Sequence, residues 1–265
     1  MLTFGDFKTT LSLLELESRP AIVHASLKSF GVIQGGAETV VQALLASISG
    51  LLVPTFTYKT MIIPEVGPPN NGLTYGSYRD LNRMAVPFHP DMPTDPLMGV
   101  LPETLRHFPG AKRTAHPILS FVGVSLGVAL HAQTILNPFA PIGVLADMDG
   151  WVMLLGVNHT VNTSIHYAEK LAGRTQFVRW ALTRNRVVEC RGFPGCSDGF
   201  EAIRPALEPY ARRVELGGSF IEAVPLKRLF QEVETRLKED PLALLCQRDD
   251  CERCNATRDM AVGVG

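Results

Sequence analysis

The chain has no uninterrupted apolar run near the roughly eighteen residues that a membrane-spanning helix needs. Its first residues carry early acids and no small-residue cleavage site, so they do not predict a secretory signal peptide. Charge is scarce and balanced, with 19% charged residues and a net charge of −1, which argues against a nucleic-acid or anionic-membrane partner. We expect a cytoplasmic protein that uses neither membrane nor nucleic acid.

Several familiar catalytic motifs are also missing: the Walker loop, G-x-G-x-x-G, H-E-x-x-H and the serine-centred elbow. Cysteines number five, and without an export signal we expect thiols or a metal site rather than disulfides. Cys246, Cys251 and Cys254 crowd into "CQRDDCERC". A fourth thiolate from Cys196 or Cys190 would complete a structural zinc site. The alternative is free thiols in a frayed tail.

Apolar residues make up 46% of the 265 residues, which is enough for a sizeable core. We expect a single domain over 1–265 with a cysteine-rich tail from about 246 to 265. Strands alternate with helices, which predicts a three-layer α/β/α fold. A hairpin at 175–193 is expected to make the central sheet mixed. The expected strands are 21–26, 51–58, 118–125 and 151–157, and the expected helices are 5–18, 37–49, 99–110, 127–136, 163–173, 200–211 and 226–240.

The segment "NHTVNTSIHYAEK" follows the apolar run "WVMLLGV". A helix beginning near Thr163 would place His166 in its first turn and Glu169 on the same face. A carboxylate that orients a histidine and supports its charged form is what a general base needs. The alternative is that His166 is an ordinary polar packing residue. His159 precedes this helix and is interpreted as a loop support.

Two other stretches combine cations with hydroxyl side chains. In "VHASLKSFG", Ser26, Ser29 and Lys28 follow a strand and precede a helix, where backbone N–H groups and hydroxyls can hold phosphates. "AKRTAHP" combines two cations with a threonine and His116. An ordinary strand-to-helix turn and a solvated loop are the alternatives.

Together these stretches resemble the aminoglycoside 3-N-acetyltransferases, a family unrelated to the GNAT fold. "DGWVMLLGVNHTVNTSIHYAE" is similar to the family's D-G-x-V-L-L-L-G-V-G-H-x-x-N-T-S-L-H-x-A-E, and "PFHPDMPTDPLMGVLPETLRHFPGAKRTAHP" resembles its F-D-P…M-G-x-x-x-E-x-x-R…R-S-x-H-P block. The "VHASLKSFG" segment looks like its early H-S-S-L/F-R-S stretch, and "LLVPTFTY" its next strand. The resemblance covers most of the chain in the same order. It implies an α/β/α fold, acetyl-CoA as donor and transfer of the acetyl group to a small-molecule amine without an acyl-enzyme.

The resemblance also implies roles for individual residues. His166 becomes the general base, assisted by Glu169. Thr163 is expected near the acetyl-CoA site, where its hydroxyl could stabilise the tetrahedral oxyanion. The remaining residues implied to bind CoA are Ser26, Leu27, Lys28 and Ser29 in the early loop and Arg113, Thr114 and His116 in "AKRTAHP".

Departures from the family pattern concern the acceptor. The family's F-D-P is Phe88-His89-Pro90 here, and "ILNPFAPIG" carries no charge. Acids are limited to Glu65 and Asp80 in 59–86 and to Glu189 and Asp198 in "VVECRGFPGCSDGF". The acceptor is therefore an aminoglycoside or a less cationic amine. A CoA-binding protein without turnover, an enzyme for another acyl-CoA, and a homodimer all stay open.

Overall fold

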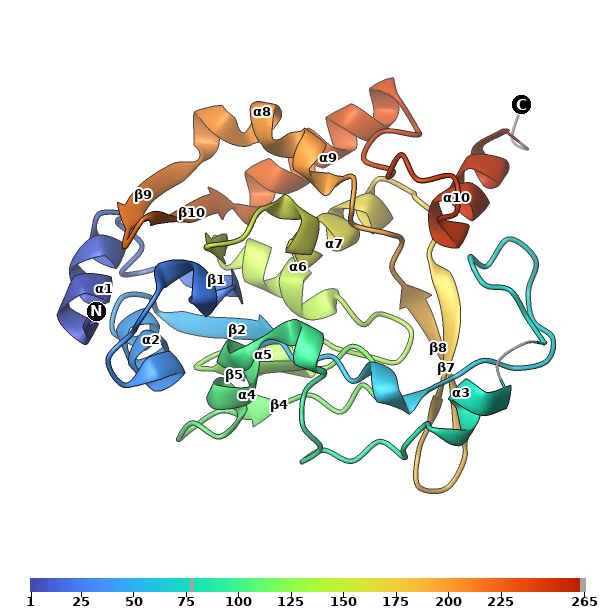
Figure 1. Cartoon of the computed structure of the whole chain (residues 1–265). Helices are drawn as coiled ribbons and strands as arrows, with labels where there is room; N and C mark the ends of the chain where they lie inside the picture. The colour runs from blue at the N-terminus through green and yellow to red at the C-terminus, as the bar shows by residue number, and fades with distance from the viewer. Residues whose placement is uncertain (77–78, 263–265) are drawn as a thin grey trace.

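The centre of the molecule is a seven-stranded sheet with strand order β4-β5-β2-β1-β6-β10-β9 (Figure 1). The computed structural model describes residues 1–76 and 79–262. β1 runs parallel to β2 and β6, and the other neighbours pair antiparallel, so the predicted mixed sheet is confirmed. The strands are β1 (Pro20–Ala25), β2 (Gly50–Pro54), β4 (Lys112–Arg113), β5 (Phe121–Val124), β6 (Trp151–Leu155), β9 (Arg212–Leu216) and β10 (Ser219–Pro225).

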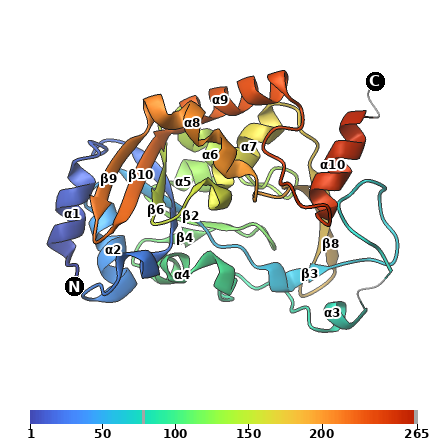
Figure 2. The ribbon, with the colours of Figure 1, turned by 45° about the horizontal axis from the view of Figure 1, so that its top comes forward.

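Helices cover both faces of this sheet, which confirms the three-layer fold (Figure 2). Side chains alternate across a strand, so the apolar run of β1 feeds two cores. Ile22 belongs to the core on one face, whereas Ala21 and Val23 belong to the core on the other. The first core holds α5 (Gly127–His131), α6 (Ala140–Asp147), α7 (Thr163–Leu171) and α9 (Leu226–Glu239), and the second holds α1 (Phe4–Ser12), α2 (Gly36–Leu45) and α4 (Val100–Arg106).

The predicted hairpin exists, but it does not join the central sheet. β7 (Phe177–Leu182) pairs with β8 (Val187–Phe193) on one side and with the short β3 (Met61–Ile62) on the other, in a separate three-stranded sheet. The antiparallel strands of the central sheet include β9 and β10, a hairpin that turns at Gly217-Gly218 and was not predicted from the sequence. β9 reads RRVEL, in which three of the five residues are charged, so it holds few of the β-branched and aromatic residues that predict a strand.

Two helix predictions and the alternative of a frayed tail need correction. The segment expected as one helix over 200–211 is broken into η5 (Phe200–Ile203), α8 (Arg204–Leu207) and η6 (Glu208–Tyr210), because Pro205 and Pro209 lack N–H donors. The first helix ends at Ser12 rather than continuing to residue 18. The tail is not frayed, since α10 (Glu252–Val262) follows the cysteines. Within the described ranges, no helix is long and apolar enough to cross a bilayer.

The topology places a ligand site at the carboxyl ends of β1, β2 and β6. β1 is paired on one side with β2 and on the other with β6. The helices that follow β1 and β6, α2 and α7, pack in the two different cores on opposite faces. A crevice opens where connections leave to opposite faces, and open α/β sheets bind ligands there.

Candidate active site

A cleft of about 1600 Å³ lies at this edge of the sheet. Two groups of segments line it. The first comprises the end of β1 with the loop after it, and residues 93–103. The second comprises residues 72–73, the stretch 193–198 after β8, and residues 248–253 of the tail. The start of α7 supplies Thr163 and His166 to the same cleft, so the two predicted segments around residues 26 and 166 do meet.

His166 is oriented by the residue that the sequence assigned to it. Its Nδ1 lies 3.1 Å from Oε2 of Glu169, one helical turn along α7. Both side chains are buried, and His166 packs between the rings of Phe139 and Phe200. When Nδ1 carries the proton and donates to Glu169, Nε2 is left with a lone pair. The arrangement can therefore accept a proton from a group in the cleft.

Arg174 completes this arrangement, and the sequence did not predict it. Its Nη1 donates to Oε1 of Glu169, and its Nη2 donates to the carbonyls of Pro241 (2.7 Å) and Ala243 (2.8 Å). The carboxylate is thus shared between an imidazole and a buried guanidinium. The available signal was the position of Arg174 directly after Gly173, which ends the helix with a φ of 88°.

The start of α7 is fixed by Asn162, the residue before the predicted first residue Thr163. Its side chain accepts from the N–H of Ser164 at 3.1 Å. Thr163 is the first residue of the helix, is buried and lines the cleft. The unpaired N–H groups and the positive dipole end of α7 therefore face the space beside His166.

His159 has the supporting position expected of it. It is fully buried, with Nε2 3.0 Å from Oε1 of Glu222 on β10. Burial favours a raised pKa for Glu222, but hydrogen bonds from His159 and Arg204 outweigh it and lower that pKa. His24 on β1 also lines the cleft, and burial together with the charges of His159 and His166 lowers its pKa to about 3. His24 is therefore a neutral imidazole at pH 7.

The two predicted CoA-binding stretches have different positions. Ser26, Leu27 and Lys28 line the cleft, together with Thr163. Ser29 lies behind them, where its Oγ donates to the carbonyl of Ser26 at 2.7 Å. Among the described residues, those that line the cleft do not include Ser29, Arg113, Thr114 or His116.

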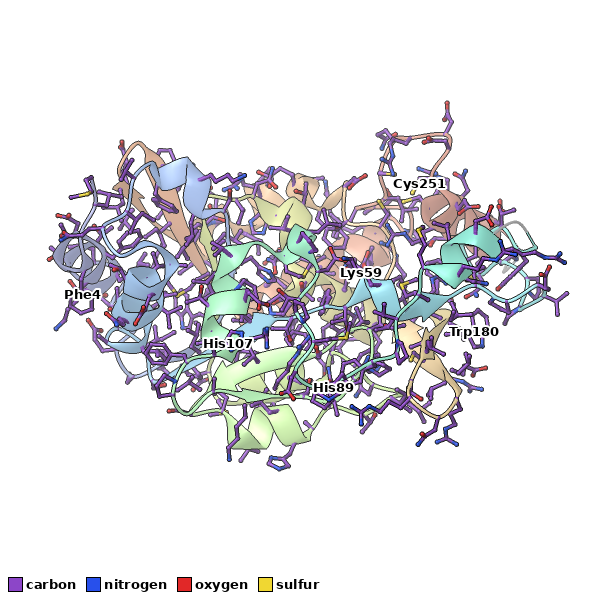
Figure 3. The ribbon with its side chains drawn as sticks, turned by 60° about the horizontal axis from the view of Figure 1, so that its bottom comes forward. Phe4, Lys59, His89, His107, Trp180 and Cys251 are labelled. Atoms are coloured by element: carbon purple, nitrogen blue, oxygen red, sulfur yellow. The ribbon has the colours of Figure 1, made fainter. Side chains whose placement is uncertain are left out.

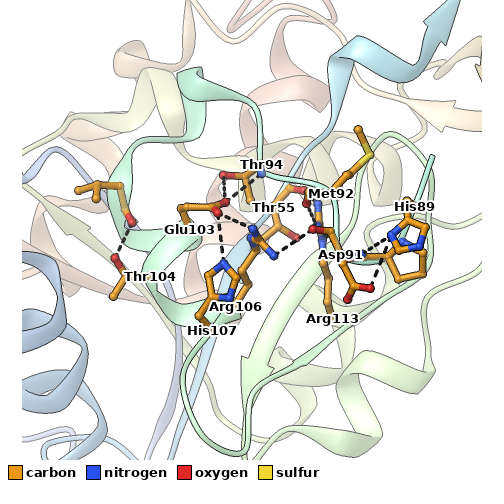
Figure 4. A network of polar contacts seen from close by, with 12 residues as sticks. Thr55, His89, Asp91, Met92, Thr94, Glu103, Thr104, Arg106, His107 and Arg113 are labelled. Atoms are coloured by element: carbon orange, nitrogen blue, oxygen red, sulfur yellow. Dashed lines mark hydrogen bonds and ion pairs between the residues drawn. The ribbon is translucent and has the colours of Figure 1, made fainter. Parts of the chain in front are cut away.

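Arg113 instead braces the segment that forms one cleft wall (Figure 4). Its guanidinium donates to the carbonyls of Pro90 (3.1 Å), Met92 and Thr55 (2.8 Å). Burial, the largest influence, lowers the pKa of Arg113 to about 10, so it stays cationic. Glu103 adds a second tie by accepting from the N–H of Thr94 at 3.0 Å.

Thr114 and His116 hold the turn before β5. The hydroxyl of Thr114 accepts from the N–H of Phe121 at 2.8 Å. Nδ1 of His116 accepts from the N–H groups of Ile118 (3.2 Å) and Leu119 (3.0 Å). Burial lowers the pKa of His116 to about 4.

The cysteines of the tail do come together with one from the stretch after β8. The Sγ atoms of Cys196, Cys246, Cys251 and Cys254 all lie within 4.8 Å of one another and are buried. Cys190, the other proposed fourth ligand, lies elsewhere on β8, and burial raises the pKa of its thiol to about 12. Hydrogen bonds from Cys254 and from the N–H of Asp198 lower the pKa of Cys196.

The tail is also a wall of the cleft, which the sequence did not predict. Arg248, Asp250, Glu252 and Arg253 line it beside Cys251. Figure 3 shows Cys251 and Trp180 of β7 at the end of the molecule opposite Phe4 of α1. The cysteine-rich tail therefore folds back onto the hairpin end of the domain.

Comparison with known proteins agrees with this geometry. The profile described as aminoglycoside 3-N-acetyltransferase matches residues 22–238. The chain belongs to the aminoglycoside 3-N-acetyltransferase family. It is thus an acyltransferase by family, and the resemblance seen in the sequence is confirmed.

Relatives of this family member cover most of its length. The aminoglycoside N(3)-acetyltransferase III of Serratia marcescens is 31% identical, covering 78% of this chain and 86% of the relative. A Salmonella protein of the same name is 29% identical, and the alignment covers 73% of this chain and 76% of the Salmonella protein.

Solved structures share the fold. The apoenzyme of the aminoglycoside acetyltransferase AAC(3)-IVa superposes with a TM-score of 0.78 at 23% identity, covering 97% of each chain. AAC-IIIb, solved as a binary complex with CoASH, has a TM-score of 0.72 at 22% identity and covers 89% of this chain and 96% of its own.

Proposed function

We propose that this protein is an acetyl-CoA-dependent N-acetyltransferase with His166 as general base and Glu169 as its assistant. The observation that carries the proposal is the 3.1 Å contact between Nδ1 of His166 and Glu169 at the wall of the large cleft. Family membership supports the reaction type, and a structural relative solved with CoASH supports the donor. The acceptor is the amino group of an aminoglycoside or a related amine.

The reaction needs one proton acceptor and one charge stabiliser. An alkylammonium first loses one proton to solvent, and the neutral nitrogen then attacks the thioester carbonyl. Nε2 of His166 takes the second proton from this nitrogen as the carbon–nitrogen bond forms, and the paired carboxylate of Glu169 stabilises the imidazolium. The tetrahedral oxyanion is stabilised by hydroxyl or N–H donors at the start of α7, with Thr163 as our candidate. Collapse breaks the carbon–sulfur bond, and the proton on His166 neutralises the CoA thiolate that leaves.

For the donor, we assign Ser26, Leu27 and Lys28 to direct contact with CoA. Leu27 and Lys28 lie in the 3-10 turn η1 (Leu27–Phe30), and Ser26 directly precedes it. They belong to the first lining group of the cleft, whereas the tail belongs to the second. Lys28 supplies a cation for a phosphate, and the turn supplies N–H groups. For Ser29, Arg113, Thr114 and His116 we propose support of the donor site through the loop and strand contacts that they make.

A structural zinc ion is proposed for the four clustered cysteines. A tetrahedral site with Zn–S bonds of about 2.3 Å places its sulfurs about 3.8 Å apart, so the cluster needs only a small contraction. The N–H groups of Cys246 and Asp198 already donate to sulfurs at 3.4 and 3.5 Å, as thiolates require. The ion would bind the tail to the stretch after β8. Elemental analysis finding one zinc per chain supports this site, and metal-free protein with four reactive thiols rejects it.

The function is tested by release of the CoA thiol from acetyl-CoA in the presence of a panel of amines that includes aminoglycosides. Amine-dependent release is the expected result. Acetyl-CoA binding without release over the whole panel would make the protein a CoA-binding family member instead. A homodimer is a separate prediction, which light scattering of the same preparation tests.

A further inference from the structure

The second lining group of the cleft carries an unusual set of charges for an enzyme that would receive a polycation. Its own cations are Arg248 and Arg253, and Arg179 of β7, which donates to the carbonyl of Gly72 in this group, also lines the cleft. Its acids are Asp198, Asp250 and Glu252. With Arg179 the cations match the acids in number, whereas a polycationic drug requires an excess of carboxylates.

The carboxylates of this wall are already engaged by the protein. Nη2 of Arg248 lies 3.3 Å from Oδ2 of Asp198, and Nε of Arg248 lies 3.8 Å from Oδ1 of Asp250. Glu252 accepts from the hydroxyl of Thr74. An ammonium group arriving here would have to compete with these partners.

Arg253 is the cation of the wall with the clearest access to a ligand. Its Nη1 donates to the carbonyl of Gly195 at 2.9 Å. Within residues 1–76 and 79–262, no carboxylate lies within ion-pair distance of this guanidinium. Tyr58 is another residue of the cleft lining, and burial raises its pKa to about 12. The positive charge of Arg253 opposes this rise, so the field of the guanidinium acts on groups inside the cleft.

The position of Arg253 is fixed on both sides. It stands between Cys251 and Cys254 in the first turn of α10, so the cysteine cluster holds its backbone. Gly72 packs on it from the other side: a Cβ at Gly72, whose φ is +56°, would lie 2.9 Å from Cα of Arg253. The positive end of the α10 dipole adds to the same field.

We propose that the acceptor is an amine that also carries an oxyanionic group, a carboxylate or a phosphate, and that Arg253 binds this group while His166 deprotonates the amine. This inference rests on the proposed function and names its substrate class. A guanidinium recognises either oxyanion through paired N–H donors, so one residue serves both chemistries.

The test compares amino sugars that differ in one group: glucosamine, glucosamine 6-phosphate, the corresponding uronic acid and the polycation kanamycin. We expect the wild-type kcat/KM to be at least about tenfold higher for an anionic sugar than for glucosamine, the size of one charge-assisted contact. The phosphate and uronic-acid arms show which oxyanion is preferred. Arg253→Gln keeps a donor for the Gly195 carbonyl and should remove the preference. Arg253→Glu should shift it toward kanamycin.

Arg191→Ala is the matched control, because Arg191 is exposed, pairs with Glu189 and lies outside the cleft lining. A wild-type preference for glucosamine or kanamycin that Arg253→Gln leaves unchanged overturns the inference, while the acetyltransferase stands. Absence of release with every amine rejects the proposed function instead. In that case, calorimetric binding of glucosamine 6-phosphate to the CoA complex decides the inference: binding lost in Arg253→Gln supports it, and no binding rejects it.

Discussion

Oε2 of Glu169 lies 3.1 Å from Nδ1 of His166, and the other oxygen of the same carboxylate accepts from Arg174. All three side chains are at most 10% exposed. The Nδ1 of His166 is therefore held by Glu169, and its Nε2 is left to accept a proton from the substrate. Arg174 links this pair to the segment before the cysteine-rich tail through the carbonyls of Pro241 and Ala243.

Replacing Glu169 by Gln tests the first of these contacts. The amide oxygen still accepts from Nδ1, so the ring keeps its orientation, but the amide has no charge to stabilise the imidazolium and its nitrogen cannot accept from Arg174. We expect kcat to fall about 10- to 100-fold, a part of the usual contribution of general-base catalysis, with little change in CoA affinity. Steady-state rates at saturating acetyl-CoA measure this. Glu208→Gln, on the exposed η6, is the control, and an unchanged kcat in Glu169→Gln would contradict the assisting role.

Arg174→Ala should act on stability. It leaves the buried carboxylate of Glu169 without its cation, and breaking a buried ion pair costs about 3 kcal/mol or more. Urea unfolding should show a correspondingly lower free energy of unfolding. Arg191→Ala removes an exposed ion pair and should change that free energy by less than about 0.5 kcal/mol. Equal effects of the two substitutions would show that the buried pair has no special importance.

Lys28→Ala tests the donor loop. A cation near a CoA phosphate at a partly exposed site contributes about 1 kcal/mol, so the KM for acetyl-CoA should rise about fivefold while kcat changes little. The effect should shrink as salt is added, because screening weakens the contact. Lys8→Ala on α1 is the control. If Lys28→Ala leaves the KM for acetyl-CoA unchanged at every salt concentration, Lys28 does not contact a CoA phosphate.

The buried His116 makes stability depend on pH. Burial lowers its pKa from the ordinary value of 6.5 to about 4 in the folded protein. Between these values the unfolded chain binds the extra proton, so the free energy of unfolding falls as pH drops below about 6.5. At about pH 4.5 the loss from this residue is about 2–3 kcal/mol relative to about pH 7.

His116→Asn keeps an acceptor for the N–H groups of Ile118 and Leu119 but cannot titrate. Its unfolding free energy should therefore fall less than that of the wild type between these two pH values. His131→Asn, at an exposed position, should behave like the wild type. A His116→Asn curve parallel to the wild type would assign the acid sensitivity to other groups, with His24 the next candidate because its pKa is also lowered, to about 3.

The sequence predicted most of what is local. The apolar run of β6, the helix start at Thr163 and the i, i+3 spacing of His166 and Glu169 each follow from a few neighbouring residues, and the structure contains all three. The alternation of strands and helices was enough for the three-layer fold. The cysteine cluster was also predictable, because its spacing already defined three of its four members.

What depends on distant packing was not predictable. Arg174 reaches Glu169 only because the segment at 241–243 folds back over α7. The hairpin of β7 and β8 pairs with β3, more than a hundred residues earlier, instead of with the central sheet. The placement of Arg253 in the cleft depends on how the tail docks beside Gly72 and Gly195. No local periodicity encodes these contacts.

The central claim is that His166 removes the proton from the acceptor amine. The most direct measurement is CoA release by His166→Ala at saturating acetyl-CoA and an amine that the wild type acetylates, with CoA binding measured calorimetrically on the same preparation. We predict a fall in kcat of about 100-fold or more, with CoA affinity within about twofold of the wild type and no change in the exposed control His131→Ala. Turnover by His166→Ala at the wild-type rate would contradict the account.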